Sequence, residues 1–269
     1  MAGRVLIVAG SDSGGGAGIQ ADIKAVSALN AYAATAITAL TAQNTIGVHG
    51  VMPVPPDFIQ QQMRAVISDI GVDCVKTGML HDAAVIEAVT DVLESELPDT
   101  PVVVDPVMVA KGGAALLDTA AVETLRTRIA KLASVLTPNI PEAEALTGLT
   151  IAGTDDMGRA AAALLALGCR AVLLKGGHLE GAVVRDLLVS ATGEERVFEN
   201  PRIETRHNHG TGCTLASAIA AGLSQGLELV DAVARAEAYL HAAILAAPGL
   251  GGGHGPVGHM HTVRPFPGG

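Results

Sequence analysis

The sequence has few aromatic residues, few charges and no long apolar run. Aromatics make up 2% of the chain and tryptophan is absent, so alanine, valine, leucine and isoleucine must fill any core. Apolar residues make up 49% and charged residues 16%, a balance that excludes a disordered chain and predicts a large buried core. No segment reaches the roughly 20 apolar residues that a membrane-spanning helix needs. We therefore expect no membrane partner.

The chain also lacks a basic excess and a paired-cysteine pattern. Its formal net charge is -10, with no basic patch of the kind that nucleic-acid-binding proteins carry, so we expect no nucleic-acid partner. Cys74, Cys169 and Cys213 are odd in number, scattered, and form no Cys-x-x-Cys pair. This usage favours a reducing cytoplasm over a disulfide scaffold. The apolar run at 5–9 is too short for a secretion signal and predicts a strand.

Short apolar runs alternate with segments of helical spacing, which is typical of a mainly parallel sheet covered by helices on both faces. We expect strands at Val5–Ala9, Ala34–Ala42, Cys74–Lys76, Val102–Val104, Ser134–Leu136 and Ala171–Leu174, and a hairpin over Val183–Val189 and Arg196–Phe198 that turns near Thr192. We expect helices at Ala17–Leu29, Asp57–Ile70, Ala83–Leu93, Ala120–Leu132, Asp156–Leu167, Gly212–Gln225 and Leu229–Ala246. Residues 1–269 are predicted to form a single domain with a mobile tail at 248–269, rich in glycine, histidine and proline.

Glycine and polar residues follow five of the predicted strands. In parallel sheets, ligands bind beyond the carboxyl ends of the strands. The segments that meet this condition are Gly10–Gly14, Thr77–Met79, Asp105–Met108, Thr137–Asn139 and Lys175–His178. Their repetition predicts one ligand site at this edge of the sheet.

The strongest local motif is His209-Gly210-Thr211-Gly212-Cys213-Thr214, which opens an alanine-rich helix. Two glycines allow a tight turn with free backbone N–H groups, and the helix N-terminus adds partial positive charge, so the motif suits a phosphate. The same field is expected to lower the pKa of the Cys213 thiol. The alternative is an ordinary glycine-rich helix start with a small buried cysteine.

The 10–18 segment could cradle a ligand, but it matches neither the dinucleotide fingerprint nor the Walker-type phosphate loop. It could equally be a flexible connection into the next helix, and Asp22 on that helix is most simply a solvated carboxylate. The carboxamide of Gln43 could pair with a ring that offers a nitrogen acceptor beside an amino donor, as a 4-aminopyrimidine does. Its alternative is a polar strand end bonded to a turn.

Four further residues suggest a phosphate and metal site. Asn139 and Glu142 flank a predicted helix start, where Pro141 suits the first turn and Glu142 suits the helix dipole. They could also hold Mg²⁺ through water, with Asp105 as a further anion. Lys175 leaves a buried strand and could neutralise phosphate charge, or could simply reach solvent at the strand end.

The histidines of the tail, His254, His259 and His261, suggest a metal site at first sight. A mobile segment lacks the ordered ligands and supporting hydrogen bonds that a metal site needs, so we expect none there.

Taken in order, these motifs resemble the hydroxymethylpyrimidine/phosphomethylpyrimidine kinase family of the ribokinase superfamily. The matching segments cover essentially the whole chain and are Gly10–Asp22, Thr38–Thr45, Lys76–Leu80, Asp105–Met108, Thr137–Ala143, Lys175–His178 and His209–Thr214. The resemblance implies a ribokinase-like three-layer α/β fold, ATP with Mg²⁺, and commonly a homodimer.

The resemblance also implies roles for individual residues. Cys213, which stands where most of the superfamily has an aspartate, would deprotonate the substrate hydroxyl. The anion hole would comprise Gly210, Thr211 and Gly212, the pyrimidine pocket Gly10, Asp22, Gln43, Met79 and Val107, and the metal and phosphate site Asn139, Glu142 and Lys175. The tail, Gly255-Pro256-Val257-Gly258-His259, is looser than the Gly-Pro-x-His-His pattern frequent in the family.

The expected reaction is ATP-dependent phosphorylation of 4-amino-5-hydroxymethyl-2-methylpyrimidine to its monophosphate and then its diphosphate, for thiamine diphosphate synthesis. A pyridoxal kinase of the same fold, or a dual-specificity enzyme, is the nearest alternative. Gln43 argues against it, because pyridoxal lacks the aminopyrimidine edge.

Two alternatives come from other classes. A cysteine hydrolase using Cys213 and His209 would need a third, orienting residue, and none is evident. A non-catalytic pyrimidine-binding protein would not need the intact 210–213 loop. ATP dependence would separate both from a kinase.

Overall fold

The structure, a computed structural model, describes residues 3–108 and 118–263. Its main feature is an eight-stranded sheet with the order β10-β9-β8-β7-β6-β5-β1-β2. The strands are β1 (Arg4–Ala9), β2 (Tyr32–Ile37), β5 (Cys74–Thr77), β6 (Val102–Val104), β7 (Val135–Leu136), β8 (Ala171–Lys175), β9 (Val183–Ser190) and β10 (Glu195–Pro201). The six strands from β2 to β8 pair in parallel, whereas the β9–β10 hairpin closes one edge in antiparallel fashion.

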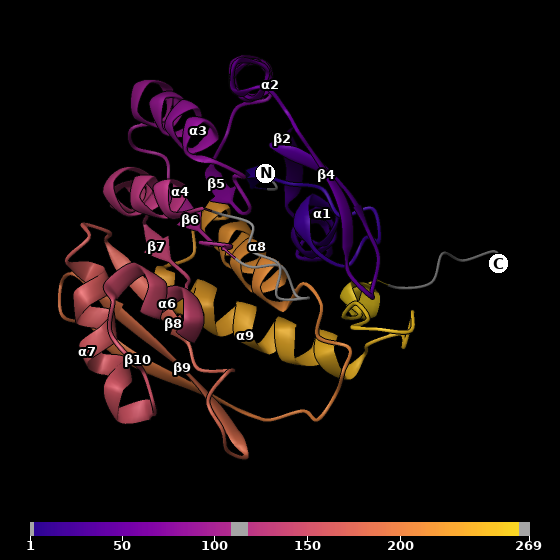
Figure 1. Ribbon diagram of the computed structural model, residues 1–269, viewed down its shortest axis with the longest axis vertical. Coiled ribbons are helices and arrows are strands. Elements are labelled where there is room, and N and C mark those ends of the chain that lie inside the picture. The colour runs from indigo at the N-terminus through magenta and orange to yellow at the C-terminus, as the bar shows by residue number, and fades with distance from the viewer. Residues whose placement is uncertain (1–2, 109–117, 264–269) are drawn as a thin grey trace.

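Helices cover both faces of this sheet (Figure 1). One face carries α1 (Gly18–Ala28), α8 (Thr211–Ser224) and α9 (Leu229–Leu245). The other carries α2 (Pro56–Asp69), α3 (Ala83–Glu96), α4 (Thr119–Thr124), a π-helical turn (Leu125–Ile129), α5 (Ala130–Leu132), α6 (Ile140–Thr147) and α7 (Thr154–Leu165). The expected three-layer α/β architecture is confirmed.

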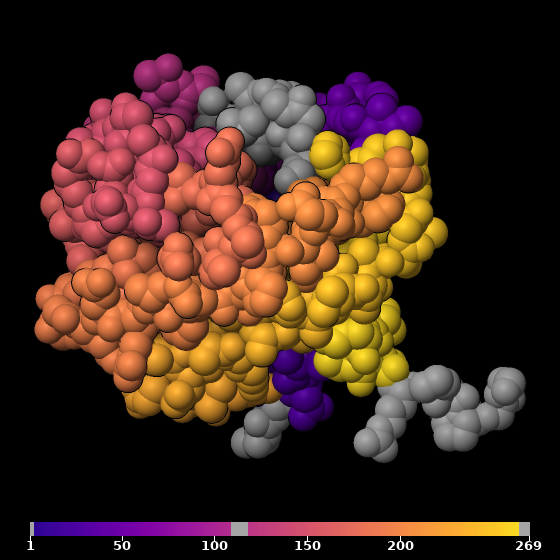
Figure 2. Space-filling view, turned by 90° about the horizontal axis from the view of Figure 1, so that it is seen from below, coloured from indigo at the N-terminus to yellow at the C-terminus, as the bar shows by residue number. Residues whose placement is uncertain are grey.

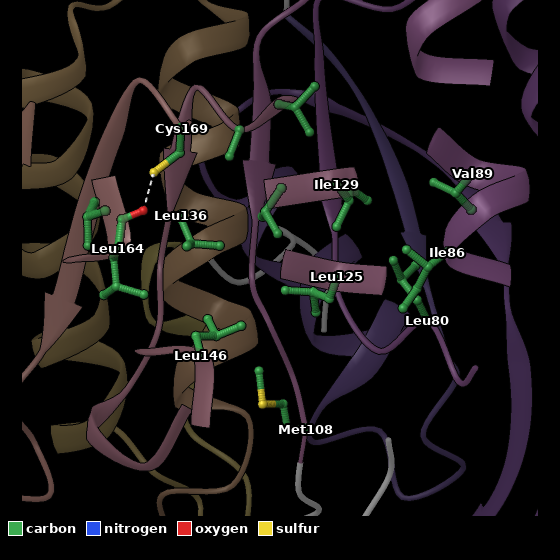
Figure 3. Packing of buried hydrophobic residues seen from close by; sticks show 14 of the residues in the cluster. Leu80, Ile86, Val89, Met108, Leu125, Ile129, Leu136, Leu146, Leu164 and Cys169 are labelled. Carbon is green, nitrogen blue, oxygen red and sulfur yellow. Dashed lines mark hydrogen bonds between the residues drawn. The ribbon is translucent and has the colours of Figure 1, made fainter. Parts of the chain in front are cut away.

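The two cores follow from strand geometry, because successive side chains of a strand point to opposite faces. Leu6 and Val8 of β1 pack under the α2–α7 layer, and Val5 and Ile7 pack under α1, α8 and α9. Leucine, isoleucine, valine and methionine fill the first core, as Figure 3 shows for a group that includes Leu125. Because aromatic residues are scarce, aliphatic side chains fill the cores on both faces of the sheet.

The predicted strand at 34–42 is wrong, because the chain bends at Thr38. The Thr38 hydroxyl donates to the Met79 carbonyl at 2.6 Å, which anchors the bend. The chain then forms β3 (Ala39–Gln43), which pairs antiparallel with β4 (Val48–Pro53) in a separate two-stranded sheet. β4 is not predicted from the sequence, because the His49-Gly50 pair interrupts its apolar pattern.

The expectation of a mobile tail is also wrong for residues 248–263. This segment ends in a 3-10 turn at His259–Thr262, and His259 is buried. The backbone N–H of His254 donates to the Thr45 carbonyl, and that of His209 donates to the Gly255 carbonyl. We call residues 249–259 the C-terminal strap. On the face shown in Figure 2, the segment after β10 (orange) lies against the C-terminal residues (yellow).

Residues 264–269 of the predicted tail lie outside the described part of the chain. Within residues 3–108 and 118–263, no helix has the length and apolar character to cross a membrane.

Candidate active site

A cavity of about 750 Å³ lies at the carboxyl ends of the parallel strands, a volume typical of small-molecule sites. It brings together almost all residues expected from the sequence. The predicted residues that line it are Gly10, Gln43, Met79, Asp105, Val107, Asn139, Glu142, Lys175, Gly210, Thr211, Gly212 and Cys213. Asp22 is the exception, since it is buried and not part of the lining.

The start of α8 has the form expected of an anion hole. Gly210 is its N-cap, with a φ of 81°, a conformation that favours glycine. A Cβ at this position would collide with the carbonyl of Gly16, so the loop sits close against the 10–18 segment. A Cβ on Gly212 would lie 3.3 Å from the Lys175 Nζ, which places the ammonium beside the first turn.

Lys175 is held between acidic groups. Its Nζ lies 3.2 Å from Asp105 Oδ1. Burial acts to lower the pKa of Lys175, but the charges of Asp105 and Glu142 outweigh it, so the pKa is raised and the side chain stays a cation. A permanent cation at the start of α8 suits a phosphate.

Asn139 and Glu142 form the capping box of α6. The Asn139 Oδ1 accepts from the Glu142 backbone N–H at 2.9 Å, and Glu142 Oε2 accepts from the Asn139 N–H at 2.8 Å. Burial raises the pKa of Glu142 to about 7, with Lys175 opposing this shift and Asp105 adding to it. These two residues therefore cap the start of α6, and both also line the cavity.

Cys213 is half-buried, at the first turn of α8. The sequence-based expectation of a lowered pKa is wrong. Burial raises the pKa of the thiol to about 12, since the lowering effect of the Lys76 ammonium is countered by Asp22 and Asp105. The unliganded site therefore holds a neutral thiol.

Behind Cys213 lies a buried ion pair that the sequence did not reveal. Both carboxylate oxygens of Asp22 accept from the Lys76 Nζ, at 2.8 and 2.9 Å, and both side chains are 0% exposed. Ser217 of α8 donates to the same carboxylate at 2.7 Å. Asp22 is thus not the solvated group expected, and it lies behind Lys76, which itself lines the cavity. A lysine inside a short apolar strand was the available signal.

Asp12 is a second residue that sequence reasoning missed. Its carboxylate accepts from the backbone N–H groups of Gly14, Gly16 and Ala17 and contacts His209 Nε2 at 2.8 Å. Burial acts to raise the pKa of Asp12, but these hydrogen bonds outweigh it and the pKa lies below its ordinary value. Asp12 therefore joins the 10–18 segment to the anion-hole loop.

The other end of the cavity contains an acidic pair, Asp186 of β9 and Glu237 of α9. The Gly176 backbone N–H and the Asn200 amide donate to Asp186 and Glu237, respectively. Burial and the nearby Asp186 carboxylate raise the pKa of Glu237 to about 9. Among the described residues, Glu237 Oε1 is buried without a hydrogen-bond partner, which suits a protonated carboxyl beside the Asp186 carboxylate.

No group of three or more histidine, cysteine, aspartate and glutamate side chains arranged for a metal occurs in the described residues. Mg²⁺ is commonly held by one or two carboxylates, waters and substrate phosphates, so such a cluster is not required. The capping box occupies one oxygen of Glu142 and one of Asn139. Their remaining capacity, together with Asp105, fits a metal held through water.

The tail histidines have a structural environment in the described residues. His259 is buried, with its Nε2 2.8 Å from the Thr214 hydroxyl. Burial lowers the pKa of His259 to about 4, so the ring is neutral at physiological pH. The loosened spacing of the tail therefore still brings one histidine behind the anion-hole loop.

Comparison with known proteins identifies the family to which the chain is similar. The family model described as phosphomethylpyrimidine kinase matches residues 12–258. The chain is 55% identical to the thiamine biosynthesis bifunctional protein ThiED of Geobacter sulfurreducens over 96% of its own length and 52% of that protein, so it spans about half of this relative. It is 51% identical to the hydroxymethylpyrimidine/phosphomethylpyrimidine kinase of Streptomyces coelicolor over 95% of the chain and 93% of that protein.

A solved structure gives the same fold. The ADP complex of Bacillus subtilis pyridoxal kinase matches with a TM-score of 0.90 and 37% identity, covering 97% of this chain and 98% of that one. The extent of the family match and the identities above decide the assignment: the chain belongs to the phosphomethylpyrimidine kinase family, a family of ribokinase-like phosphotransferases.

Proposed function

We propose that the chain uses ATP to phosphorylate 4-amino-5-hydroxymethyl-2-methylpyrimidine, and then its monophosphate, for thiamine diphosphate synthesis. The observation that carries this proposal is the shared cavity. It joins a carboxamide suited to an aminopyrimidine, Gln43, to a helix start suited to a phosphate. Half-buried Cys213 lies in the first turn of that helix.

Phosphoryl transfer depends mainly on positioning and on stabilising charge on the transferred group. Gln43 fixes the ring, and the apolar side chains of Met79 and Val107 form its walls. The backbone N–H groups at the start of α8 and the Lys175 ammonium stabilise the negative charge of the transferred group. Asp105, Asn139 and Glu142 would hold Mg²⁺ through water, and a bound Mg²⁺ would neutralise further phosphate charge.

Cys213 accepts the proton of the substrate hydroxyl. A neutral thiol cannot accept a proton, so Cys213 must first release its own proton to water in the cavity when the substrate and nucleotide bind. The Lys76 ammonium lowers the free energy of that thiolate, and Asp22 holds the ammonium in place. We therefore assign Lys76 and Asp22 as positioning residues behind the reacting group.

Pyridoxal phosphorylation is the alternative that one observation favours, namely the likeness to a pyridoxal kinase over nearly the whole chain. Gln43 distinguishes the two readings. We expect Gln43→Met to raise the ratio of kcat/KM for pyridoxal to that for the pyrimidine. An unchanged ratio would show that Gln43 does not select the substrate.

The test of the activity is direct. The protein is incubated with Mg-ATP and hydroxymethylpyrimidine, and the products are separated by mass, with pyridoxal in a parallel reaction. We expect the monophosphate first and the diphosphate later. Phosphorylated pyridoxal without phosphorylated pyrimidine would replace the proposal by the alternative.

A homodimer and a cytoplasmic location remain proposals. The first rests on the family resemblance and the second on the unpaired cysteines, and light scattering of the purified protein tests the first.

A further inference from the structure

The orientation of the Gln43 carboxamide is controlled by its neighbours. Gln43 Nε2 lies 3.3 Å from His209 Nε2, and Gln43 Oε1 lies 3.4 Å from the Thr41 hydroxyl. A carboxamide offers two donors on nitrogen and two acceptor sites on oxygen, and the two ends have nearly equal size. The hydrogens carried by His209 and Thr41 therefore decide which end faces which neighbour.

Asp12 fixes the hydrogen on His209. Its carboxylate oxygen lies 2.8 Å from His209 Nε2, while the other oxygen accepts from Gly14. An ionised carboxylate only accepts hydrogen bonds, so Nε2 must carry a hydrogen and donate it. This short, charge-assisted bond outweighs the longer contact to Gln43. His209 therefore presents an N–H, and no lone pair, to its neighbours at Nε2.

Thr41 constrains the other end of the Gln43 carboxamide. Its hydroxyl donates its single hydrogen to the Ser11 carbonyl at 2.9 Å, so it can only accept from Gln43. His209 then requires the amide oxygen, and Thr41 requires the amide nitrogen. Both contacts select the same amide orientation, rotated by half a turn from that in the structure, where two donors face each other at His209.

The order of donor and acceptor matters to a bound ring. With its oxygen toward the His209 N–H, which is donated mainly to Asp12, and one N–H engaged by Thr41, Gln43 offers an acceptor and its second N–H to the cavity. An aminopyrimidine presents an amino donor beside a ring acceptor. Its hydroxymethyl group must point toward Cys213, so the ring cannot turn over to match a reversed amide.

We propose that His209, oriented by Asp12, is a specificity-determining positioning residue that sets the Gln43 carboxamide for an aminopyrimidine. The packing keeps the imidazole in place. A Cβ on Gly16 would lie 2.6 Å from the His209 Cδ2, and the His209 backbone N–H donates to the Gly255 carbonyl of the strap. This inference rests on the proposed pyrimidine kinase activity.

The test is a double-mutant cycle of His209→Leu and Gln43→Met. Dissociation constants of hydroxymethylpyrimidine and pyridoxal are measured by calorimetry for the wild type, both single variants and the double variant. We expect His209→Leu to weaken pyrimidine binding about tenfold, the scale of one positioned hydrogen bond, with a smaller effect on pyridoxal. In the Gln43→Met background, the same change should add little.

Two further variants keep the test decisive. His209→Gln supplies an amide N–H at similar reach and should recover most of the pyrimidine affinity, which a purely structural role would not predict. If His209→Leu does not fold, His209→Asn enters the same cycle, since its shorter side chain loses the reach to Gln43.

Equal losses for both ligands, or full additivity with Gln43→Met, would overturn the proposal for His209. Failure of the proposed function has a different signature: the wild type would then give no phosphorylated hydroxymethylpyrimidine with Mg-ATP.

Discussion

At the scale of single residues, two opposing influences act on the pKa of the Cys213 thiol. The Cys213 thiol lies at a helix N-terminus, yet burial and two nearby carboxylates hold its pKa at about 12. The helix field alone would act in the opposite direction. The balance depends on the charges of Asp22 and Lys76, which only the tertiary structure brings near Cys213.

This balance predicts how Cys213 reacts with an alkylating reagent. Since the thiolate is the reactive form, the rate with iodoacetamide should rise steadily from pH 7 to pH 10 without a plateau. Mass spectrometry of the peptide that contains residue 213 gives the rate, with Cys213→Ser as the control. A plateau near pH 7 would mean that the thiol is already ionised in the free protein.

The acidic pair predicts a pH-dependent stability. Because the pKa of Glu237 is raised to about 9 in the fold, its contribution is fully present below its unfolded pKa and is lost as pH rises toward 9. Glu237→Gln keeps an N–H for Asp186 at every pH. We expect its melting temperature to exceed that of the wild type by about 2–4 °C at pH 9, with a smaller difference at pH 5.

Thermal unfolding at both pH values measures this effect. Glu194→Gln, which changes an exposed carboxyl on the β9–β10 hairpin, is the matched control and should show no such pH dependence. The same difference at pH 5 and pH 9 would contradict a raised pKa for Glu237.

At the scale of elements, sequence patterns predict the buried strands well and the edge elements poorly. Val102–Val104 and Ala171–Leu174 are continuous apolar runs, so their strands are readable from composition alone. The bend at Thr38 depends on a hydrogen bond to the distant Met79 carbonyl, and no local pattern encodes it. β4 has an exposed face and an internal glycine, so it lacks a clear apolar period.

In the candidate site, too, some features can be predicted from the sequence and others cannot. The glycines of the 209–214 motif predict, from the sequence alone, a tight turn with free backbone N–H groups. The ion pair of Lys76 with Asp22 joins residues 54 positions apart, and the Asp12 contact with His209 joins residues 197 positions apart. Such pairs arise from the fold, so a single sequence cannot disclose them.

The start of α8 allows a matched comparison of two helical glycines. A Cβ on Gly212 would meet Lys175 and Asp105, whereas a Cβ on Gly158 in α7 would meet nothing within 4 Å. Gly212→Ala should fold normally yet lower kcat/KM for ATP about tenfold, because it displaces the cation that stabilises the phosphate. Steady-state kinetics measures this.

Gly158→Ala serves as the control for that comparison. It should leave the kinetics unchanged and stabilise the fold by about 0.5–1 kcal/mol, the usual gain from replacing a helical glycine. Equal kinetic constants for both variants would show that Lys175 does not contribute to phosphate binding.

At the scale of the whole molecule, the C-terminal strap joins parts that are distant in sequence. It contacts the β3–β4 turn at Thr45, the anion-hole loop at His209, and α8 through His259 and Thr214. The two ends of the proposed substrate pocket are therefore held by one segment. A change in the strap should therefore alter substrate binding through the segments that it contacts.

Two neighbouring glycines test this coupling. A Cβ on Gly253 would collide with the Thr45 carbonyl, whereas a Cβ on Gly252 would meet nothing within 4 Å. We expect Gly253→Ala to raise KM for hydroxymethylpyrimidine several-fold through the turn next to Gln43, while Gly252→Ala leaves KM unchanged. An unchanged KM in both variants would show that the strap does not support the pyrimidine pocket.

We propose that phosphoryl transfer takes place at the start of α8, with Cys213 accepting the hydroxyl proton. The most direct measurement is the single-turnover rate of Cys213→Ala with saturating Mg-ATP and hydroxymethylpyrimidine. We expect a rate lower by about a hundredfold or more, the usual contribution of a general base, with substrate affinity nearly unchanged. A variant as fast as the wild type would contradict it.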